Sequence, residues 1–420
     1  MHAGTADVLI VGGSYVGQTF ALALAHEFGP DLRICIIDRN AAPTSDFGSG
    51  LGIDDRDPRA SALSAGSRNL LQTLGLWHRL DDVAVAVSEI ELTDSSLKAG
   101  VRRRLLTYDN RSADGVQASW IVPNAHLAAA LEQCIAATPS IEMVRQASVR
   151  SVDNKPDQVT ITLADGRVLH APLLVAADGR RSSVREAVGI KSVQWDHGQI
   201  GIVTAITHEL DHQNRAIQHF LPGGPFAMLP LKGGHRSCVT WSETADEARR
   251  ILALDDSAFL EEVDRRAAGR LGAVTLDGPR KSWPLETHLA RSYTANRVAL
   301  IGDAAHGVHP IAGQGLNLGI RDIAALVECV VDAAHVGLDI GNADTLARYE
   351  RWRRFDTTVS TATFSGLNRL FSNDWALMRS AREVGLGVLD QMPRIKQAFV
   401  TEAAGLNGEL PKLLQNQRAP

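Results

Sequence analysis

The first 40 residues constrain the fold of this chain most strongly, because they read as a strand, a tight turn, a helix and a second strand. Residues 7–11 (DVLIV) form a short β-branched run, and residues 16–26 are rich in helix formers. The second strand, residues 33–37, ends at Asp38. A dinucleotide-binding fold places at this position the acid that accepts hydrogen bonds from a ribose. The segment therefore predicts a nucleotide-binding β-α-β unit.

The turn between the first strand and the helix carries glycines where such a unit requires them. Gly12 allows the tight turn, Gly13 follows it, and Gly17 permits close packing of the helix. The free N–H groups of the first helical turn, at the positive end of the helix dipole, would face a pyrophosphate. The pattern departs from G-x-G-x-x-G at Ser14. A tight turn without a ligand therefore stays an alternative when this loop is considered alone.

A second glycine-rich segment, residues 298–322 (VALIGDAAHGVHPIAGQGLNLGIRD), is more specific. Its strand ends at Asp303, whose carboxylate can accept hydrogen bonds from a sugar-alcohol chain. Residues 313–315 (GQG) open a helix whose free N–H groups could hold an anionic ring. Two helix N-termini would then hold the two ends of one large cofactor. His306 and His309 lack a carboxylate or cysteine at ligand spacing, so we expect no metal site.

Composition excludes several classes of protein. A formal net charge of −5 and a pI near 6.3 argue against binding to nucleic acid, because neutralising phosphates needs a basic excess. The four cysteines stand far apart, so neither a disulfide framework nor a cysteine-based metal site is expected. No stretch reaches the roughly 18 apolar residues of a membrane helix. We expect a cytoplasmic protein that at most lies on the inner face of a membrane.

Patterns further along the chain predict its organisation. Residues 46–57 are rich in Gly and Asp and predict a loop, and residues 60–76 read as a helix, which puts Arg59 at the junction. Residues 190–285 alternate like strands, with Gly and Pro breaks, and predict an inserted antiparallel sheet. We therefore predict three units: a discontinuous nucleotide-binding domain (1–80, 120–189 and 286–345), an inserted substrate domain (81–119 and 190–285) and a C-terminal helical region (346–420).

The run from Asp303 to Asp322 resembles the signature of the ubiquinone-biosynthesis hydroxylases, which belong to the class A flavoprotein monooxygenases. The resemblance covers nearly the whole chain, including residues 120–123 (WIVP), the Asp178-Gly179 motif and residues 224–231 (GPFAMLPL). It implies a two-domain α/β fold like that of p-hydroxybenzoate hydroxylase. In this fold a Rossmann-like FAD domain carries an inserted antiparallel sheet that binds the substrate, followed by C-terminal helices.

The resemblance also implies a role for individual residues. Arg59 would contact the FAD phosphates or ribityl chain, and Asp178 and Gly179 would serve both FAD and NAD(P)H. Asp303 would bind the ribityl chain. Residues 313–317 would line the pyrimidine edge of the flavin. The complete set of cofactor-binding residues expected on this basis is Gly12, Gly13, Ser14, Gly17, Asp38, Arg59, Asp178, Gly179, Asp303, Gly313, Gln314, Gly315, Leu316 and Asn317.

The implied reaction is hydroxylation of the aromatic ring of a prenylated phenol, a ubiquinone precursor, by O2 through a flavin C4a-hydroperoxide. Electrons would come from NAD(P)H or from a partner reductase or ferredoxin, and no side chain is assigned as the catalytic base. Two alternatives remain: a hydroxylase of the same fold with another aromatic substrate, and a non-catalytic subunit of a quinone-biosynthesis assembly. Phe226, Met228 and Pro310 are candidates for the substrate pocket, although Phe226 and Met228 could equally be plain core.

The C-terminal region permits two interpretations. Apolar residues between 359 and 371 recur at helical spacing, and arginines at 348–354 precede them. Such a helix could lie on an anionic membrane, where a prenylated substrate would be found, or contact other proteins of quinone biosynthesis. It could also pack on the FAD domain with its arginines in solvent.

Overall fold

A computed structural model of the chain describes residues 4–41, 57–94, 104–111, 115–308, 313–371, 404–406 and 409–415. Its nucleotide-binding part is built on a six-stranded sheet, which is parallel except at one edge. The order is β19 (Thr294–Ala295), β20 (Val298–Leu300), β12 (Leu173–Ala176), β1 (Val8–Val11), β2 (Ile34–Ile37) and β8 (Ile141–Val144). The inner strands are continuous runs of buried apolar residues, as expected for strands covered on both faces.

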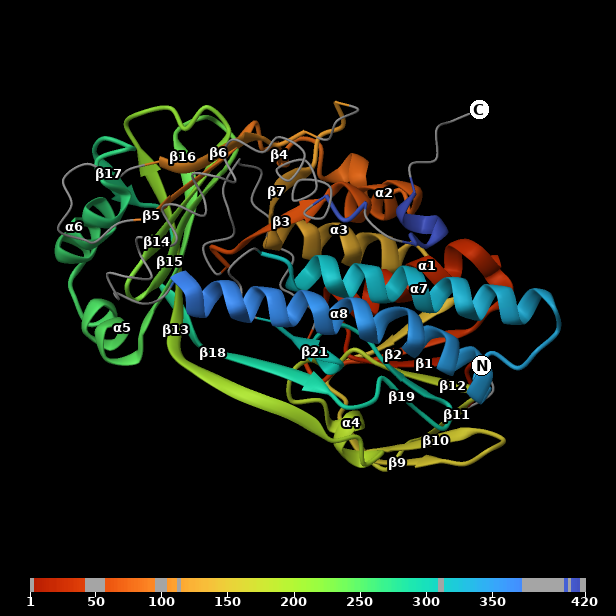
Figure 1. The fold of residues 1–420 in the computed structure, drawn as a ribbon. Coiled ribbons are helices and arrows are strands. Elements are labelled where there is room, and N and C mark those ends of the chain that lie inside the picture. Colours follow the sequence, from red (N-terminus) through yellow and green to blue (C-terminus); the bar gives the residue numbers. More distant parts are fainter. Residues whose placement is uncertain are drawn as a thin grey trace.

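Helices cover this sheet and form the largest apolar core with it. Helix α1 (Tyr15–Phe28) packs against α3 (Asn124–Ala136) and α7 (Gly315–His335), and α7 packs against the long helix α8 (Ala343–Phe371). Figure 1 shows α7 and α8 running side by side, with α8 extending to the large antiparallel sheet, where it contacts β15 (Gly224–Pro230). The helix α8 therefore spans both halves of the molecule.

The second half is a nine-stranded sheet. Its main order is β21 (His306–Gly307), β18 (Lys281–Ala290), β13 (Ser192–His208), β16 (Arg236–Thr244), β15, β14 (Arg215–Leu221), β5 (Glu89–Asp94) and β6 (Arg104–Asp109), with β17 (Val274–Leu276) paired to β13. Helices α5 (Ala245–Leu252) and α6 (Asp256–Ala267) cover its outer side (Figure 1) and close a second apolar core. The pairs of this sheet are antiparallel, as the strand pattern predicts for the inserted unit, except that β14 and β5 run parallel.

Two smaller sheets complete the fold. One joins β3 (Ala60–Ser64), β7 (Ser119–Pro123) and β4 (Val85–Ala86), and the other joins β9 (Val149–Asn154), β10 (Val159–Leu163) and β11 (Val168–Ala171). The predicted helix over residues 60–76 is wrong at its start, because residues 60–64 pair with β7 and only Ala65–Thr73 form helix α2. Helix α4 (Ser183–Ala187) follows β12. The domain boundaries stay a prediction.

Candidate functional site

The glycine loop after β1 has no room for side chains. A Cβ on Gly17 would lie 1.9 Å from the carbonyl oxygen of Gly12, and one on Gly12 would lie 2.2 Å from that of Ala177. Gly12 also has a φ of +108°, in the region that favours glycine. The N–H of Gly13 donates to Oδ2 of Asp38 over 3.0 Å. These contacts bring the N-terminus of α1 against the ends of three neighbouring strands.

Ser14, the departure from the glycine pattern, occupies the N-cap of α1 without strain. Its backbone is extended (φ −95°), its side chain is exposed, and it makes no capping hydrogen bond to the helix. A Ser side chain at an N-cap ordinarily accepts from the first-turn N–H groups. Because Ser14 does not do so, those groups remain available for an anion.

A cavity of about 160 Å³ opens beside this loop. Asp38 lies in it and accepts from the backbone N–H of Asn40 over 2.8 Å as well as from Gly13. Gln18 donates to the carbonyl of Gly13 over 2.7 Å and to Glu132, which also pairs with Arg145. Sequence reasoning missed these last three residues. They come from α1, from α3 and from the residue after β8, which only the tertiary fold brings together, so no local pattern marks them.

Asp303 lies in the turn after β20, where a short 3-10 helix, η3 (Gly302–Ala304), begins. Its side chain is exposed to open space, yet protein surrounds it closely enough for desolvation to raise its pKa, against the opposing charges of Arg180 and His306. Gly302 has a φ of +57°, and a Cβ on it would lie 3.1 Å from the Val16 side chain of α1. The acid is thus placed next to the first turn of the nucleotide-binding helix.

The motif at residues 313–317 opens α7 as predicted. Gln314 is the N-cap and makes no side-chain capping bond, so the first-turn N–H groups of α7 have no such partner among the described residues. The side chain of Asn317 points inward. Its oxygen accepts from Ser64 N (3.0 Å) and Ser67 Oγ (2.8 Å), and its amide donates to the carbonyl of Ala62 (2.8 Å). Asn317 therefore holds the start of α7 on β3 and α2.

The Asp178-Gly179 motif serves in part as a helix cap. Oδ2 of Asp178 accepts from the backbone and hydroxyl of Ser183 over 2.7 and 3.1 Å and from Val184 N over 3.3 Å, at the start of α4. Its Oδ1 is buried and has no hydrogen-bond partner among the described residues. Gly179 follows with a φ of +84°. One carboxylate oxygen is thus left for a bound group.

Arg59 is half exposed and forms a two-point ion pair with Asp57, at 2.7 and 2.8 Å. Hydrogen bonding to Asp57 raises the pKa of Arg59 above its usual value. A cofactor phosphate would therefore compete with Asp57 for this guanidinium. The contact of Arg59 with FAD stays a prediction.

Two buried histidines lie behind the Asp303 turn. His288 of β18 is 1% exposed and pairs across the sheet with Gly307, and its neighbour Leu289 pairs with His306. Burial, together with the charges of Arg185 and Arg180, lowers the pKa of His288 to about 3. His288 is therefore neutral at neutral pH. Sequence reasoning missed it because a single His in a strand carries no local signal.

The candidate substrate residues lie on one face of β15. Phe226 and Met228 are buried in the core beneath α5 and α6, where the Phe226 ring packs on Trp241 with the centroids 5.4 Å apart. The opposite face of β15 presents Leu229, which packs against a separate apolar cluster that Ala62 of β3 and Trp283 of β18 also border. The pocket role of Phe226 and Met228 stays a prediction, and Pro310 lies outside the described residues.

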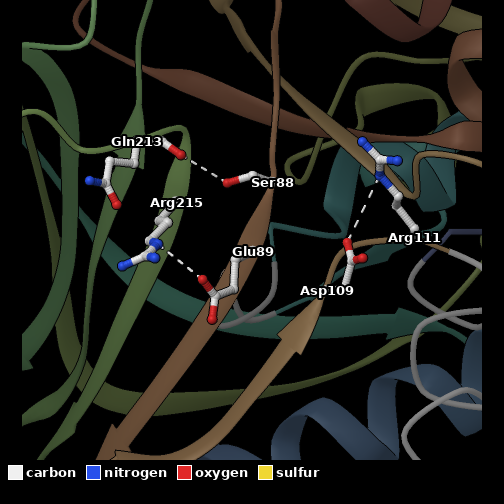
Figure 2. Close-up of a pocket in the computed structure, with 6 residues that line it drawn as sticks. All are labelled: Ser88, Glu89, Asp109, Arg111, Gln213 and Arg215. Carbon is white, nitrogen blue, oxygen red and sulfur yellow. Dashed lines mark hydrogen bonds and ion pairs between the residues drawn. The ribbon is translucent and has the colours of Figure 1, made fainter.

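A larger hollow, of about 450 Å³, lies at the edge of the large sheet. Figure 2 shows that its charged side chains face one another: Glu89 pairs with Arg215 at 2.9 Å, and Arg111 lies 4.0 Å from Asp109. It contains none of the predicted site residues. We therefore place the functional site at the glycine loop and the Asp303 turn.

Comparison with solved structures defines the class of fold. The chain superposes on p-nitrophenol 4-monooxygenase PnpA from Pseudomonas putida DLL-E4 with a TM-score of 0.78 and 20% identity, covering 97% of this chain and 99% of that one. The corresponding values for PqsL from Pseudomonas aeruginosa in complex with 2-aminobenzoylacetate are 0.74 and 24%, covering 91% and 99%. The fold is thus that of the p-hydroxybenzoate hydroxylase-like flavoprotein monooxygenases, as the resemblance implies.

Sequence comparison identifies the family. The profile of the FAD binding domain family matches residues 5–355. Ubiquinone hydroxylase UbiL of Rhodospirillum rubrum is 39% identical, covering 98% of this chain and 92% of the relative, and the human ubiquinone biosynthesis monooxygenase COQ6 is 30% identical, covering 95% and 92%. The chain belongs to this FAD-binding family and, within it, to the ubiquinone-biosynthesis hydroxylases. It is a flavoprotein monooxygenase, and its cofactor is FAD.

Proposed function

We propose that this chain hydroxylates the aromatic ring of a prenylated phenol, a precursor of ubiquinone. The observation that carries the flavin chemistry of this proposal is that two helix N-termini without side-chain caps, those of α1 and α7, lie near two carboxylates, Asp38 and Asp303. The 39% identity to a protein named ubiquinone hydroxylase supports the substrate class.

The residues present fit FAD. Only a backbone without side chains fits at Gly12 and Gly17, which suits the pyrophosphate at the N-terminus of α1, and the cavity beside them contains Asp38, whose carboxylate suits the ribose hydroxyls of the adenosine half. Asp303 would hold the ribityl chain, and the first turn of α7 the pyrimidine edge of the ring. When bound, the flavin supplies redox chemistry: reduced by two electrons, it activates O2, so that one oxygen atom enters the ring and the other leaves as water.

The chain itself positions the cofactor and the substrate, provides an electric field at the flavin ring and keeps water from the reacting atoms. The positive end of α7 favours negative charge on a ring placed there, an effect of roughly 0.3 to 2 kcal/mol. A Cβ on Gly313 would lie 3.5 Å from the Cβ of Ala62, so the start of α7 adjoins the apolar cluster that Ala62, Leu229 and Trp283 border. We place the substrate ring beside this cluster, because apolar side chains there would help to keep water from the reacting atoms.

The first experiment is an absorption spectrum of the purified protein, with the heat-released cofactor identified by chromatography. We expect a flavin spectrum and released FAD, and then substrate-dependent oxygen uptake that is faster with prenylated phenols than with simple ones. The Asp303→Ala variant, purified and measured in the same way, should retain less FAD than the parent protein. Preference for simple phenols would favour another aromatic substrate. A colourless protein that takes up no FAD would favour a non-catalytic subunit.

The electron donor is a separate question. NAD(P)H is our first candidate because Asp178 keeps one oxygen without a partner at the motif that the resemblance assigns to it. Anaerobic addition of NADH or NADPH should bleach the flavin within the turnover time. Bleaching only with an added reductase or ferredoxin would favour a partner protein.

We also propose that α8 contacts an anionic membrane surface. Phe355 is 77% exposed, and the exposed Arg351 and Arg354 lie one turn before it or beside it. Among the described residues, no helix has the length and apolar character needed to cross a bilayer. Vesicles with anionic lipid should cosediment the protein, and Phe355→Asp should weaken this. Failure to bind any vesicle would leave a protein of the quinone-biosynthesis assembly as the occupant of this face.

A further inference from the structure

Asp322 of α7 is a fully buried carboxylate, 0% exposed, with hydrogen-bond donors from three other elements. Its Oδ2 accepts from the backbone N–H of Gly302 over 2.9 Å and from Nε2 of His306 over 2.5 Å. Its Oδ1 accepts from Nε of Arg353 on α8 over 2.8 Å. Burying a carboxylate costs free energy because the group loses its hydration. The attraction of its partners offsets this cost only if all of them are held in place.

The first of these partners connects the cluster to the cofactor site. Gly302 immediately precedes Asp303, and its backbone packs between α1 and α7. A Cβ on Gly302 would lie 3.1 Å from the side chain of Val16, and one on Gly319 would lie 3.4 Å from the Cα of Gly302. The turn that carries Asp303 is therefore enclosed by the two helices whose N-termini face the cofactor, and Asp322 anchors it by its backbone.

The helix α8 holds the same turn from the other side. The hydroxyl of Tyr349 donates to the carbonyl of Leu300 over 2.7 Å, at the end of the strand that leads into the turn. One helical turn later, Arg353 reaches Asp322 and also pairs with Asp356. Between them, Glu350 accepts from Thr294 over 2.7 Å. Tyr349 and Arg353 of α8 thus hold, respectively, the strand that leads into the Asp303 turn and the carboxylate that anchors this turn.

The charge of Asp322 is maintained by its partners. Burial by itself raises the pKa of a carboxyl group, but His306 and Arg353 outweigh it and hold the pKa of Asp322 below its usual value. Asp322 is therefore ionised at neutral pH and acts as an acceptor toward all its donors.

We propose that Asp322, His306 and Arg353 are positioning residues that fix the Gly302–Asp303 turn and so set the affinity for the ribityl-flavin half of FAD. This inference rests on the proposed placement of the ribityl chain at Asp303. A purely structural role of the cluster would affect the binding of both halves of FAD alike. In our proposal the adenosine half would bind elsewhere, at the loop of Gly12 and Asp38. Disturbing the cluster should therefore weaken FAD binding and spare ADP binding.

The test compares Asp322→Asn with Asp332→Asn. Both changes remove an ion pair between α7 and α8, but Asp332 lies at a half-exposed position, and its charged partners among the described residues are Arg348, at 2.8 Å, and Lys412, at 3.4 Å, neither of which belongs to the turn. Apoprotein would be titrated with FAD by fluorescence and with ADP by calorimetry. We expect Asp322→Asn to raise the Kd for FAD at least tenfold and change that for ADP less than twofold, with Asp332→Asn close to the parent for both.

Controls keep the outcomes separate. Circular dichroism of the apoprotein would confirm folding; if Asp322→Asn does not fold, Arg353→Lys, which keeps the charge but moves the donor, should raise the FAD Kd at least fivefold. An unchanged FAD Kd, or an equal loss of FAD and ADP affinity, would overturn the proposal. Asp303→Asn distinguishes the two levels of inference, because an unchanged FAD Kd in that variant would refute the ribityl placement itself.

Discussion

At the residue scale, Gly17 leaves almost no room for a side chain. An added Cβ would lie 1.9 Å from the carbonyl oxygen of Gly12, and because that atom is backbone, the helix itself would have to move. We expect Gly17→Ala to lower the free energy of unfolding by about 1 to 3 kcal/mol, the usual cost of overpacking. Urea denaturation of the apoprotein measures this.

The control is Gly315→Ala, at the start of α7, where the nearest atom to an added Cβ is a Val308 methyl at 3.9 Å. The free energy of unfolding of this variant should lie within about 0.5 kcal/mol of the parent value, as is usual for substitutions that create no clash, cavity or unpaired polar group. Equal effects at both glycines would show that the tight contact in the loop relaxes at little cost.

At the scale of elements, Asn317 joins α7 to β3 and α2 through three bonds of 2.8 to 3.0 Å. Asn317→Ala leaves Ser64 N and the Ala62 carbonyl without these partners, so we expect a loss of about 3 kcal/mol in unfolding free energy. Gln314→Ala, which removes only a 3.3 Å bond, should cost less than about 0.5 kcal/mol. Matching losses in the two variants would argue that Asn317 is not the joint between these elements.

At the scale of the whole molecule, His288 lies where the large sheet meets the Asp303 turn, through the pairing of β18 with β21. Its pKa is lowered to about 3, by burial and then by Arg185 and Arg180, whereas in the unfolded chain it titrates near 6.5. The unfolded state therefore binds more protons below that pH. The contribution of neutral His288 to the free energy of unfolding is therefore fully present above pH 6.5, and it is lost as the pH falls toward 3.

Between pH 7.5 and 5.5 this single group should account for about 1.4 kcal/mol of lost unfolding free energy. His288→Gln should reduce the acid-induced loss by about that amount, measured by urea denaturation at the two pH values. His78→Gln, at an exposed position, should leave the loss as in the parent. If His288→Gln has the same pH dependence as the parent, then protonation of His288 in the folded protein costs little free energy, contrary to the prediction.

Sequence by itself determined the parts of this protein that depend on local backbone geometry. The first β-α-β unit, Asp38 after its second strand, Asp303 after β20 and the opening of α7 at residues 313–315 all lie where the motifs place them. Tight turns and helix N-termini impose requirements on a few consecutive residues, chiefly glycines, so they are visible without a partner.

Only the tertiary structure decided what these elements meet. Residues 60–64 became a strand because β7, some 60 residues later, offers its edge. The side chains of Gln18, Glu132 and Arg145 gather in one cavity, and Asp322 collects donors from Gly302, His306 and Arg353. Such contacts between distant residues depend on tertiary packing. A buried carboxylate or guanidinium is tolerated only where the folded chain places an oppositely charged or hydrogen-bonding partner beside it. No short stretch of sequence contains that information.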